Sequence, residues 1–152
     1  MKKLIPLCLL MATVMLHSQS SVAQKKSPIL NHIAVYVHDL QVTTAFYRDI
    51  VQIDTMPEPF HDGRHTWFKI GGHSQLHLIS GVKEITSHDK NAHLCFSVGD
   101  MNSFIARLKS NNIPFESWQG VAGVPTKRVD GVQQIYFKDP EGNWIEINDD
   151  KY

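Results

Sequence analysis

The chain repeats one pattern twice, and this repeat limits the possible folds more than any other feature of its 152 residues. Residues 31–40 read NHIAVYVHDL, and residues 92–101 read AHLCFSVGDM. In each stretch a histidine opens an alternating run that is typical of a strand, and an aspartate follows seven residues later. The aspartate can cap a helix, because its carboxylate accepts the free N–H groups of the first turn. The sequence therefore predicts helices over residues 41–51 and 101–111.

The strands that follow each helix repeat as well. His77 comes eight positions after Lys69, and Glu146 comes eight positions after Lys138. The second interval contains the sequence Asp-Pro-Glu-Gly at 139–142. This is a strong turn signal, because proline presets φ at the second position and glycine relieves the last. Each copy is thus predicted to be a strand, a helix and a meander of about three strands.

These elements predict an α+β fold in a single domain over residues 24–152. Two pseudo-symmetric βαβββ modules, about 29–80 and 92–149, are expected to form a concave mixed sheet, with a polar linker over residues 81–91. A chain of this length is too short for two independent domains of ordinary size.

The N-terminus has the features of a cleavable signal peptide over residues 1–23. A basic start precedes an apolar run over residues 4–16, and Ser21 and Ala23 supply small side chains before a cleavage position. The run of roughly 13 residues is short of the ~20 that a membrane-spanning helix needs, which leaves an uncleaved anchor as the alternative. We therefore expect residues 24–152 to be exported, to the periplasm or the medium, and to hold no membrane segment.

The charge and cysteine content of the mature part exclude some functions. Lys2 and Lys3 leave with the signal, so 13 basic residues remain against 15 acidic ones. These few basic residues are scattered, which argues against a nucleic-acid surface. Cys95 is the only cysteine left in the mature part, so no disulfide within the domain can stabilise its fold. We expect Cys95 to be a small buried apolar residue, with a reactive thiol as the alternative.

Four residues of the repeat have the character of metal ligands. Alternate side chains of a strand point to opposite faces, and in each strand the apolar neighbours of these residues take the helix side. His32, His77, His93 and Glu146 are then left to point to the concave face. Imidazoles and a carboxylate in one cavity are costly to bury unless they are paired or bind a metal. The four matched positions predict a divalent-metal site.

His77 is the least secure of the four, because three ligands and water suffice to hold a metal. A single histidine in a strand is also more often a hydrogen-bonded residue than a ligand. The other histidines fall at strand ends or in polar connections and are predicted to be solvated: His38, His61, His65, His73 and His88.

With these residues in place, the sequence resembles the vicinal oxygen chelate superfamily. The superfamily includes glyoxalase I, extradiol dioxygenases, fosfomycin-resistance transferases, methylmalonyl-CoA epimerase and bleomycin-resistance proteins. The resemblance runs from about Ile29 to Asp149, and four stretches carry it: 32–40, 46–49, 139–143 and 144–147. It implies that the first strand of each module supplies a ligand and that the last strand supplies another, which matches the four residues above.

Departures from the family patterns narrow the implied function. Glyoxalase I usually has a glutamate where this chain has His77, which argues against strict glyoxalase I activity. The fosfomycin enzymes typically have a threonine where this chain has Ala34, which argues against their reaction. Bleomycin-resistance proteins lack the ligands, so an intact set argues against simple sequestration. Because one scaffold hosts several chemistries, the resemblance specifies the fold better than the reaction.

The leading hypothesis is an exported, glyoxalase-like isomerase or lyase. A small substrate would chelate a divalent metal, Zn, Ni, Fe or Mn, through two neighbouring oxygens. Glu146 or a metal-bound hydroxide would then move a proton on the carbon beside the carbonyl. Aromatic residues are predicted to wall the pocket, and basic residues to hold an anionic substrate: Tyr36, Trp67, Trp118 and Tyr136, with Arg64, Lys127 or Arg128.

Two other hypotheses stay open. The first is an extradiol-type Fe(II) dioxygenase built on His32, His93 and Glu146. The second is a module that binds a metal or a small ligand without turnover. A homodimer is expected by default, and the ligands would come from one chain or from two.

Overall fold

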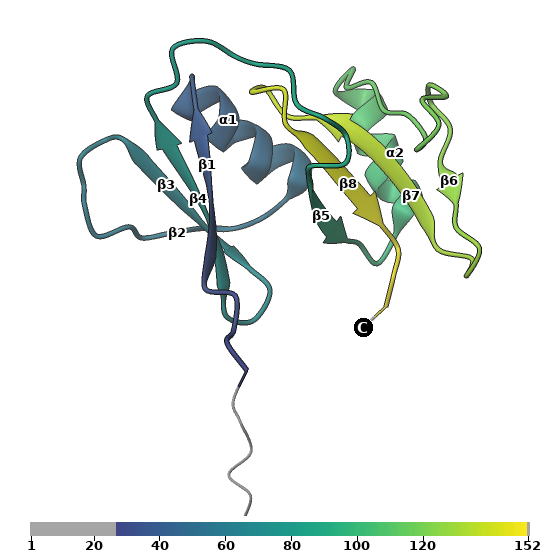
Figure 1. The fold of residues 1–152 in the computed structure, drawn as a ribbon, viewed down its shortest axis with the longest axis horizontal. Helices are drawn as coiled ribbons and strands as arrows, with labels where there is room; N and C mark the ends of the chain where they lie inside the picture. Colours follow the sequence, from purple (N-terminus) through teal and green to yellow (C-terminus); the bar gives the residue numbers. More distant parts are fainter. Residues whose placement is uncertain (1–26, 152) are drawn as a thin grey trace, which may run out of the picture.

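The computed structural model describes residues 27–151, and the predicted signal peptide, residues 1–23, lies outside them. Two βαβββ modules follow one another in the chain (Figure 1). The first consists of β1 (His32–Val37), α1 (Leu40–Phe46), η1 (Tyr47–Val51), β2 (Thr55–Met56), β3 (His65–Ile70) and β4 (Ser74–Ser80). The second consists of β5 (His93–Ser97), α2 (Met101–Ser110), β6 (Thr126–Lys127), β7 (Gln133–Lys138) and β8 (Trp144–Asn148). The predicted α+β fold is confirmed.

Each module has its own four-stranded mixed sheet, and the two sheets have the same strand order. The orders are β1-β4-β3-β2 and β5-β8-β7-β6. In each sheet the first strand lies at the edge and runs parallel to the last strand of the module. The register repeats too, because His77 lies opposite Trp67 and Glu146 lies opposite Tyr136. The equal spacing seen in the sequence thus places His77 and Glu146 at equivalent positions.

Both helices begin at the predicted aspartates. Asp39 accepts the backbone N–H groups of Gln41 and Val42 at 3.0 Å, and Asp100 accepts that of Ser103 at 3.0 Å. The first predicted helix is α1 continued by the π-helical turn η1, and it ends where Gln52 takes a left-handed φ of 63°. None of the described helices is long and apolar enough to cross a membrane.

The two modules share one hydrophobic core on the helix side of both sheets. α1 packs on β4, and the rings of Phe46 and Phe137 lie 6.1 Å apart between the modules. A polar contact crosses the same boundary, because the Tyr47 hydroxyl donates to Asp139 at 3.0 Å. The second module therefore has a fixed position relative to the first within the chain.

The turn at 139–142 fastens the second module to the start of α1. Glu141 is 4% exposed and accepts the backbone N–H of His38 at 2.7 Å and that of Asp39 at 3.2 Å. The Thr43 hydroxyl also donates to it, at 2.7 Å. One buried carboxylate thus receives three donors that lie about a hundred residues away in the sequence.

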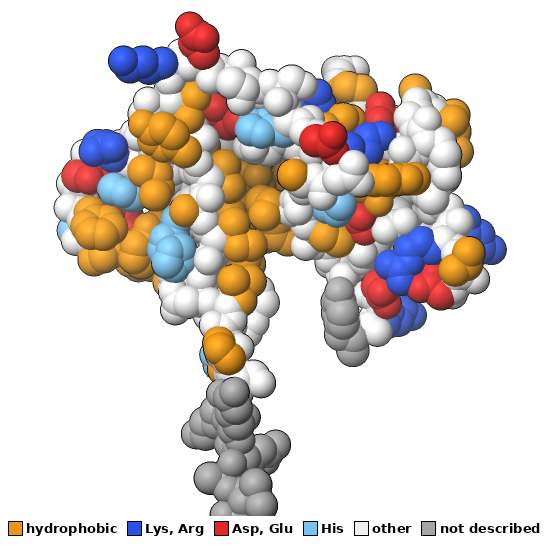
Figure 2. Space-filling model, in the orientation of Figure 1, with side chains coloured by type: hydrophobic (Ala, Val, Ile, Leu, Met, Phe, Trp, Pro, Cys, Tyr) orange, Lys and Arg blue, Asp and Glu red, His pale blue; other side chains and the backbone are white. Residues whose placement is uncertain are grey.

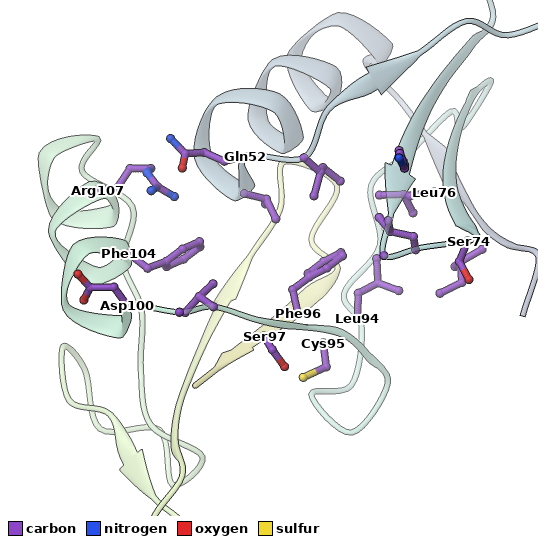
Figure 3. A pocket seen from close by; sticks show the side chains of 18 of the residues that line it. Gln52, Ser74, Leu76, Leu94, Cys95, Phe96, Ser97, Asp100, Phe104 and Arg107 are labelled. Atoms are coloured by element: carbon purple, nitrogen blue, oxygen red, sulfur yellow. The ribbon is translucent and has the colours of Figure 1, made fainter. Parts of the chain in front are cut away.

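A cavity of about 730 Å³ lies between the two modules. Hydrophobic side chains from both sheets and from α2 line much of it, among them Ile33, Leu76, Leu94, Phe96 and Phe104. Figure 2 shows hydrophobic side chains gathered between the two halves of the molecule. Leu94 and Phe96 face the cavity in Figure 3, whereas Cys95 and Ser97 point to the opposite side of β5.

Candidate metal centre

The four predicted ligands form two pairs, one on each sheet. On the first sheet the rings of His32 and His77 stack with centroids 4.3 Å apart. On the second, Nε2 of His93 lies 3.3 Å from Oε2 of Glu146. Within residues 27–151, no three His, Cys, Asp or Glu side chains gather closely enough to hold a metal ion. The predicted ligands therefore lie as two separate pairs, His32 with His77 and His93 with Glu146, which we call candidate half-sites.

Of the four predicted ligands, Glu146 is the one fixed by the most side-chain hydrogen bonds. It is 5% exposed, and its two carboxylate oxygens accept hydrogen bonds from four side chains. The donors are Tyr136 Oη at 2.6 Å, Gln134 Nε2 at 2.7 Å, Asn148 Nδ2 at 3.0 Å and Cys95 Sγ at 3.3 Å. Burial alone would raise the pKa of Glu146, but these hydrogen bonds together outweigh it and hold that pKa below its usual value. Glu146 is therefore a carboxylate at neutral pH.

His93 has the tautomer that a ligand needs. Its Nδ1 lies 2.7 Å from the backbone carbonyl oxygen of Lys90. Because a carbonyl only accepts, Nδ1 carries a proton, and in the neutral ring Nε2 is then the nitrogen with the lone pair. Nε2 lies 3.3 Å from Oε2 of Glu146, so in the neutral ring two acceptor atoms would face each other. A second ring proton or a cation between the atoms satisfies both, and an imidazole with a carboxylate suits a divalent transition metal.

The first sheet holds its histidines in a stack of three flat rings. His77 lies between His32 and Trp67, with centroids 4.3 and 4.0 Å away and ring planes tilted by 6° and 2°. Nδ1 of His32 lies 2.7 Å from the Asn31 side-chain oxygen, which leaves its Nε2 free. Nε2 of His77 is used, because it lies 2.7 Å from the side-chain oxygen of Gln75. Burial and the neighbouring His32 lower the pKa of His77, so its ring is neutral at neutral pH.

Known proteins share this arrangement of modules. The sequence model of the Glyoxalase/Bleomycin resistance protein/Dioxygenase superfamily matches residues 29–147. The chain belongs to this superfamily. The YaeR protein of Escherichia coli (strain K12) is 30% identical over 129 residues, which are 78% of this chain and 93% of YaeR. The metallothiol transferase FosB of Staphylococcus epidermidis (strain ATCC 12228) is 30% identical over 124 residues, 78% of this chain and 80% of FosB.

Solved structures of the superfamily share the fold. The oxidase ChaP-H2 has a TM-score of 0.69 at 24% identity, with 84% of this chain and 97% of that one covered. Members of the superfamily typically use a divalent metal and bind small molecules. The half-sites described above are the groups of this chain that fit such a metal.

The predicted substrate residues of this superfamily member lie at different distances from the ligands. Trp67 stacks on His77, and its indole Nε1 is buried without a hydrogen-bond partner among the described residues. Tyr136 is buried and bonds to Glu146. Tyr36, on the same strand as His32, is 57% exposed.

The basic residues that were predicted to hold an anionic substrate either contact other groups or lie at the edge of the molecule. Arg64 precedes β3 and donates to the Ser80 carbonyl at 3.4 Å, at the far end of the sheet from His32. Arg128 pairs with Asp130. Lys127 is exposed on the short edge strand β6.

Two sequence predictions are wrong in detail. Cys95 is exposed, because it belongs to the concave side of an edge strand. Although the residue is exposed, its thiol is partly desolvated against Glu146, and this desolvation together with the negative charge of Glu146 raises the pKa of Cys95 to about 12, which opposes a reactive thiolate. The His65 side chain is only 15% exposed rather than solvated, because it packs on Phe60 and bonds to Asp62 at 2.9 Å.

Three residues of the site were missed in the sequence. Gln134 and Asn148 both donate to Glu146, and the alternation of β7 and β8 places them on its face. That alternation is a signal that could have identified them. Lys90 lies in the linker, where no periodicity marks it.

Proposed function

We propose that the chain is a metal-dependent enzyme of the glyoxalase type, an isomerase or lyase for a small substrate with two neighbouring oxygens. The observation that carries this proposal is the 3.3 Å approach of His93 Nε2 to an ionised Glu146, with Nδ1 of the same ring bonded to a carbonyl. His32, with a free Nε2, would complete the set, and His77 is its candidate fourth member. The related FosB is named a metallothiol transferase, and a mouse relative at 30% identity is named a methylmalonyl-CoA epimerase.

Each part of the site has a chemical task in this proposal. When bound, the metal would supply Lewis-acid activation of the chelating oxygens. Glu146 would hold it with a carboxylate that its hydrogen-bond donors keep ionised. Tyr136 donates to Glu146 and fixes its orientation, and Trp67 supplies an apolar wall beside the histidines. Proton transfer by Glu146 stays a prediction.

We further propose that a second copy of the chain completes the site. β1 and β5 each lie at the edge of a sheet and carry His32 and His93. If β1 of one copy pairs with β5 of another, the order β4-β1-β5-β8 brings the two half-sites together on one face. An open strand edge also favours such pairing, because its backbone groups need partners.

A second candidate is an Fe(II) dioxygenase. Because Nε2 of His77 is bound to Gln75, the most accessible ligand set is His32, His93 and Glu146. Two histidines and one carboxylate are the usual ligands of non-haem Fe(II) oxygenases.

Metal analysis of purified variants tests the site. The wild-type chain is loaded anaerobically with Zn²⁺, Ni²⁺, Mn²⁺ or Fe²⁺, and bound metal is counted after gel filtration. We expect His93→Ala and Glu146→Gln to lose the metal, and the exposed His73→Ala to keep it as the matched control. Full metal content in His32→Ala, His93→Ala and Glu146→Gln would refute the proposal. Loss in these three but not in His77→Ala would reduce the set to three ligands.

Turnover assays separate the reactions. A hemithioacetal substrate and an epimerisable thioester probe the first candidate, and a catechol under oxygen with Fe²⁺ probes the second. Metal binding with no turnover of any of them would favour a module that only binds.

Export of the mature domain is likewise a proposal, supported by the basic start and apolar run of residues 1–23. The intact mass of protein recovered outside the cytoplasm tests it, and we expect cleavage after Ala23. A mass that retains residues 1–23 would contradict cleavage and favour an anchor.

A further inference from the structure

Lys90, at the end of the linker, is held more firmly than a surface lysine. Its side chain is 18% exposed. Three aromatic rings surround the ammonium, with centroids 4.8, 5.6 and 6.0 Å from Nζ: Trp144, Tyr136 and Trp118. Such rings attract a cation through their negative faces. The rings come from β8, from β7 and from the segment before β6, so the cage spans the second module.

The polar partners of this ammonium are also complete. Lys90 forms an ion pair with Glu116, and Nζ lies 3.3 Å from the carbonyl oxygens of Ser117 and Trp118. An ammonium has three donors, and here three acceptors receive them. Glu116 is itself fixed, because its backbone bonds to Tyr136 in both directions at 2.8 and 2.9 Å. The side chain of Lys90 is therefore tied to the sheet that carries Glu146.

The main chain of the same residue contacts a predicted ligand. The carbonyl oxygen of Lys90 accepts the Nδ1 proton of His93 at 2.7 Å. In the neutral ring this bond favours the tautomer with the proton on Nδ1, and it turns Nε2 toward Glu146. The position of one backbone carbonyl thus decides which nitrogen of His93 is available.

We propose that Lys90 is a positioning residue of the metal centre. The aromatic and carboxylate cage anchors its side chain, and the anchored residue holds the carbonyl that sets the tautomer of His93. The role in a metal centre rests on the proposed function, whereas control of the His93 tautomer does not. Partners that orient a ligand histidine commonly matter for affinity, and their loss costs about 10–100-fold.

The test compares Lys90→Met with Lys90→Arg and with a matched lysine. Methionine keeps an unbranched side chain but removes the charge, whereas arginine keeps the charge. Lys138 is the control, because its Nζ also lies 4.8 Å from the Trp144 ring but the residue is exposed on β7. Lys138→Met therefore removes a cation from one ring of the cage while Lys90 and its polar partners stay in place.

The first measurement uses the metal-free protein. Long-range ¹H–¹⁵N NMR at about pH 8 reports which ring nitrogen of a neutral histidine carries the proton, and His93→Gln assigns the signals. We expect the Nδ1–H form in the wild-type chain, in Lys90→Arg and in Lys138→Met, and a mixture of both tautomers in Lys90→Met. An unchanged His93 tautomer in folded Lys90→Met would overturn the proposal. If Lys90→Met does not fold, Glu116→Gln is measured in its place, with the same expectation and the same refuting result.

The second measurement is the affinity for Zn²⁺ by competition with a chelating dye. We expect about 10–100-fold weaker binding in Lys90→Met and an unchanged affinity in Lys138→Met. Equal affinities in these two variants would overturn the role in the metal centre. If the wild-type chain binds no metal, the proposed function fails, and the tautomer of the metal-free protein still decides whether Lys90 positions His93.

Discussion

At the scale of single residues, Glu146 combines burial with ionisation. A buried carboxylate is stable only when donors replace its lost water, and here Tyr136 supplies the shortest of four hydrogen bonds. We predict that Tyr136→Phe costs about 1–3 kcal/mol of unfolding free energy at neutral pH, because it leaves a buried charge with one donor fewer. The exposed Tyr36→Phe is the control and should change stability by less than about 0.5 kcal/mol.

The pH dependence of this difference follows from the lowered pKa of Glu146. A carboxyl group whose pKa is lower in the folded state stabilises the fold above its usual pKa, and that stabilisation disappears as the pH falls through the lowered value. The difference between the wild-type chain and Tyr136→Phe should therefore shrink on acidification from neutral pH. Urea denaturation over this range measures it, and a difference that grows on acidification would contradict the argument.

The ring stack of His32, His77 and Trp67 limits how a metal can bind. Lone pairs of ring nitrogens lie in the ring plane, and the stacked rings of His32 and His77, nearly parallel with centroids 4.3 Å apart, cannot both hold one metal ion in their planes. If His32 and His77 both bind the metal, at least one of the two rings must turn, and loading then alters the environment of Trp67. We predict that Zn²⁺ changes tryptophan emission in the wild-type chain and in Trp118→Phe but not in Trp67→Phe. The same change in Trp67→Phe would contradict the prediction, because the signal would then come from another tryptophan.

At the scale of elements, the turn at 139–142 also holds α1 in place through hydrogen bonds to Glu141. Thr43 is fully buried, and its hydroxyl donates to Glu141 at 2.7 Å. We predict that the isosteric Thr43→Val costs about 1–3 kcal/mol of unfolding free energy, because Glu141 loses a donor where water cannot replace it. Thermal or urea unfolding measures the loss, with the exposed Thr86→Val as the control. A loss as small as that of the control would mean that Glu141 needs only its backbone donors.

The sequence predicts strands, helix starts and side-chain parity because these depend on near neighbours. Asp39 and Asp100 cap their helices as expected, and His77 and Glu146 take equivalent positions in two sheets. The two-residue strands β2 and β6 are too short for an alternation to be seen. The partners of Glu141 are unpredictable for another reason, since they depend on how the modules pack.

The same distinction explains what was missed around the ligands. Lys90 lies in a polar linker, and its environment forms only when three aromatic residues from separate segments meet around it. The exposure of Cys95 depends on β5 lying at the edge of its sheet, which the repeat alone does not specify. We inferred that four ligands converge from the alternation of side chains along each strand. This alternation predicts the face of the sheet on which a side chain lies, but not its distance from a side chain on another sheet.

At the scale of the whole molecule, the two half-sites lie at two open edges. β1 carries His32, β5 carries His93, and each strand has a partner on one side only among the described sheets. Ile29 and Leu30, just before β1, are 77% and 56% exposed. An apolar segment beside an open edge favours association with another chain. Pairing of β1 with β5 of a second copy would cover both features and complete the metal centre.

A mixed dimer of two inactive chains tests this arrangement directly. One chain carries His32→Ala and the other Glu146→Gln, and both are co-expressed with different tags so that the heterodimer can be purified. If each site combines His32 of one chain with Glu146 of the other, one site of the heterodimer receives both substitutions and its second site receives neither. Its metal content should then be about half that of the wild-type dimer, although each variant alone binds none. If one chain supplies all the ligands, each site of the heterodimer has lost a ligand and no metal should be recovered. The number of metal ions per heterodimer thus separates a shared site from two sites closed within single chains.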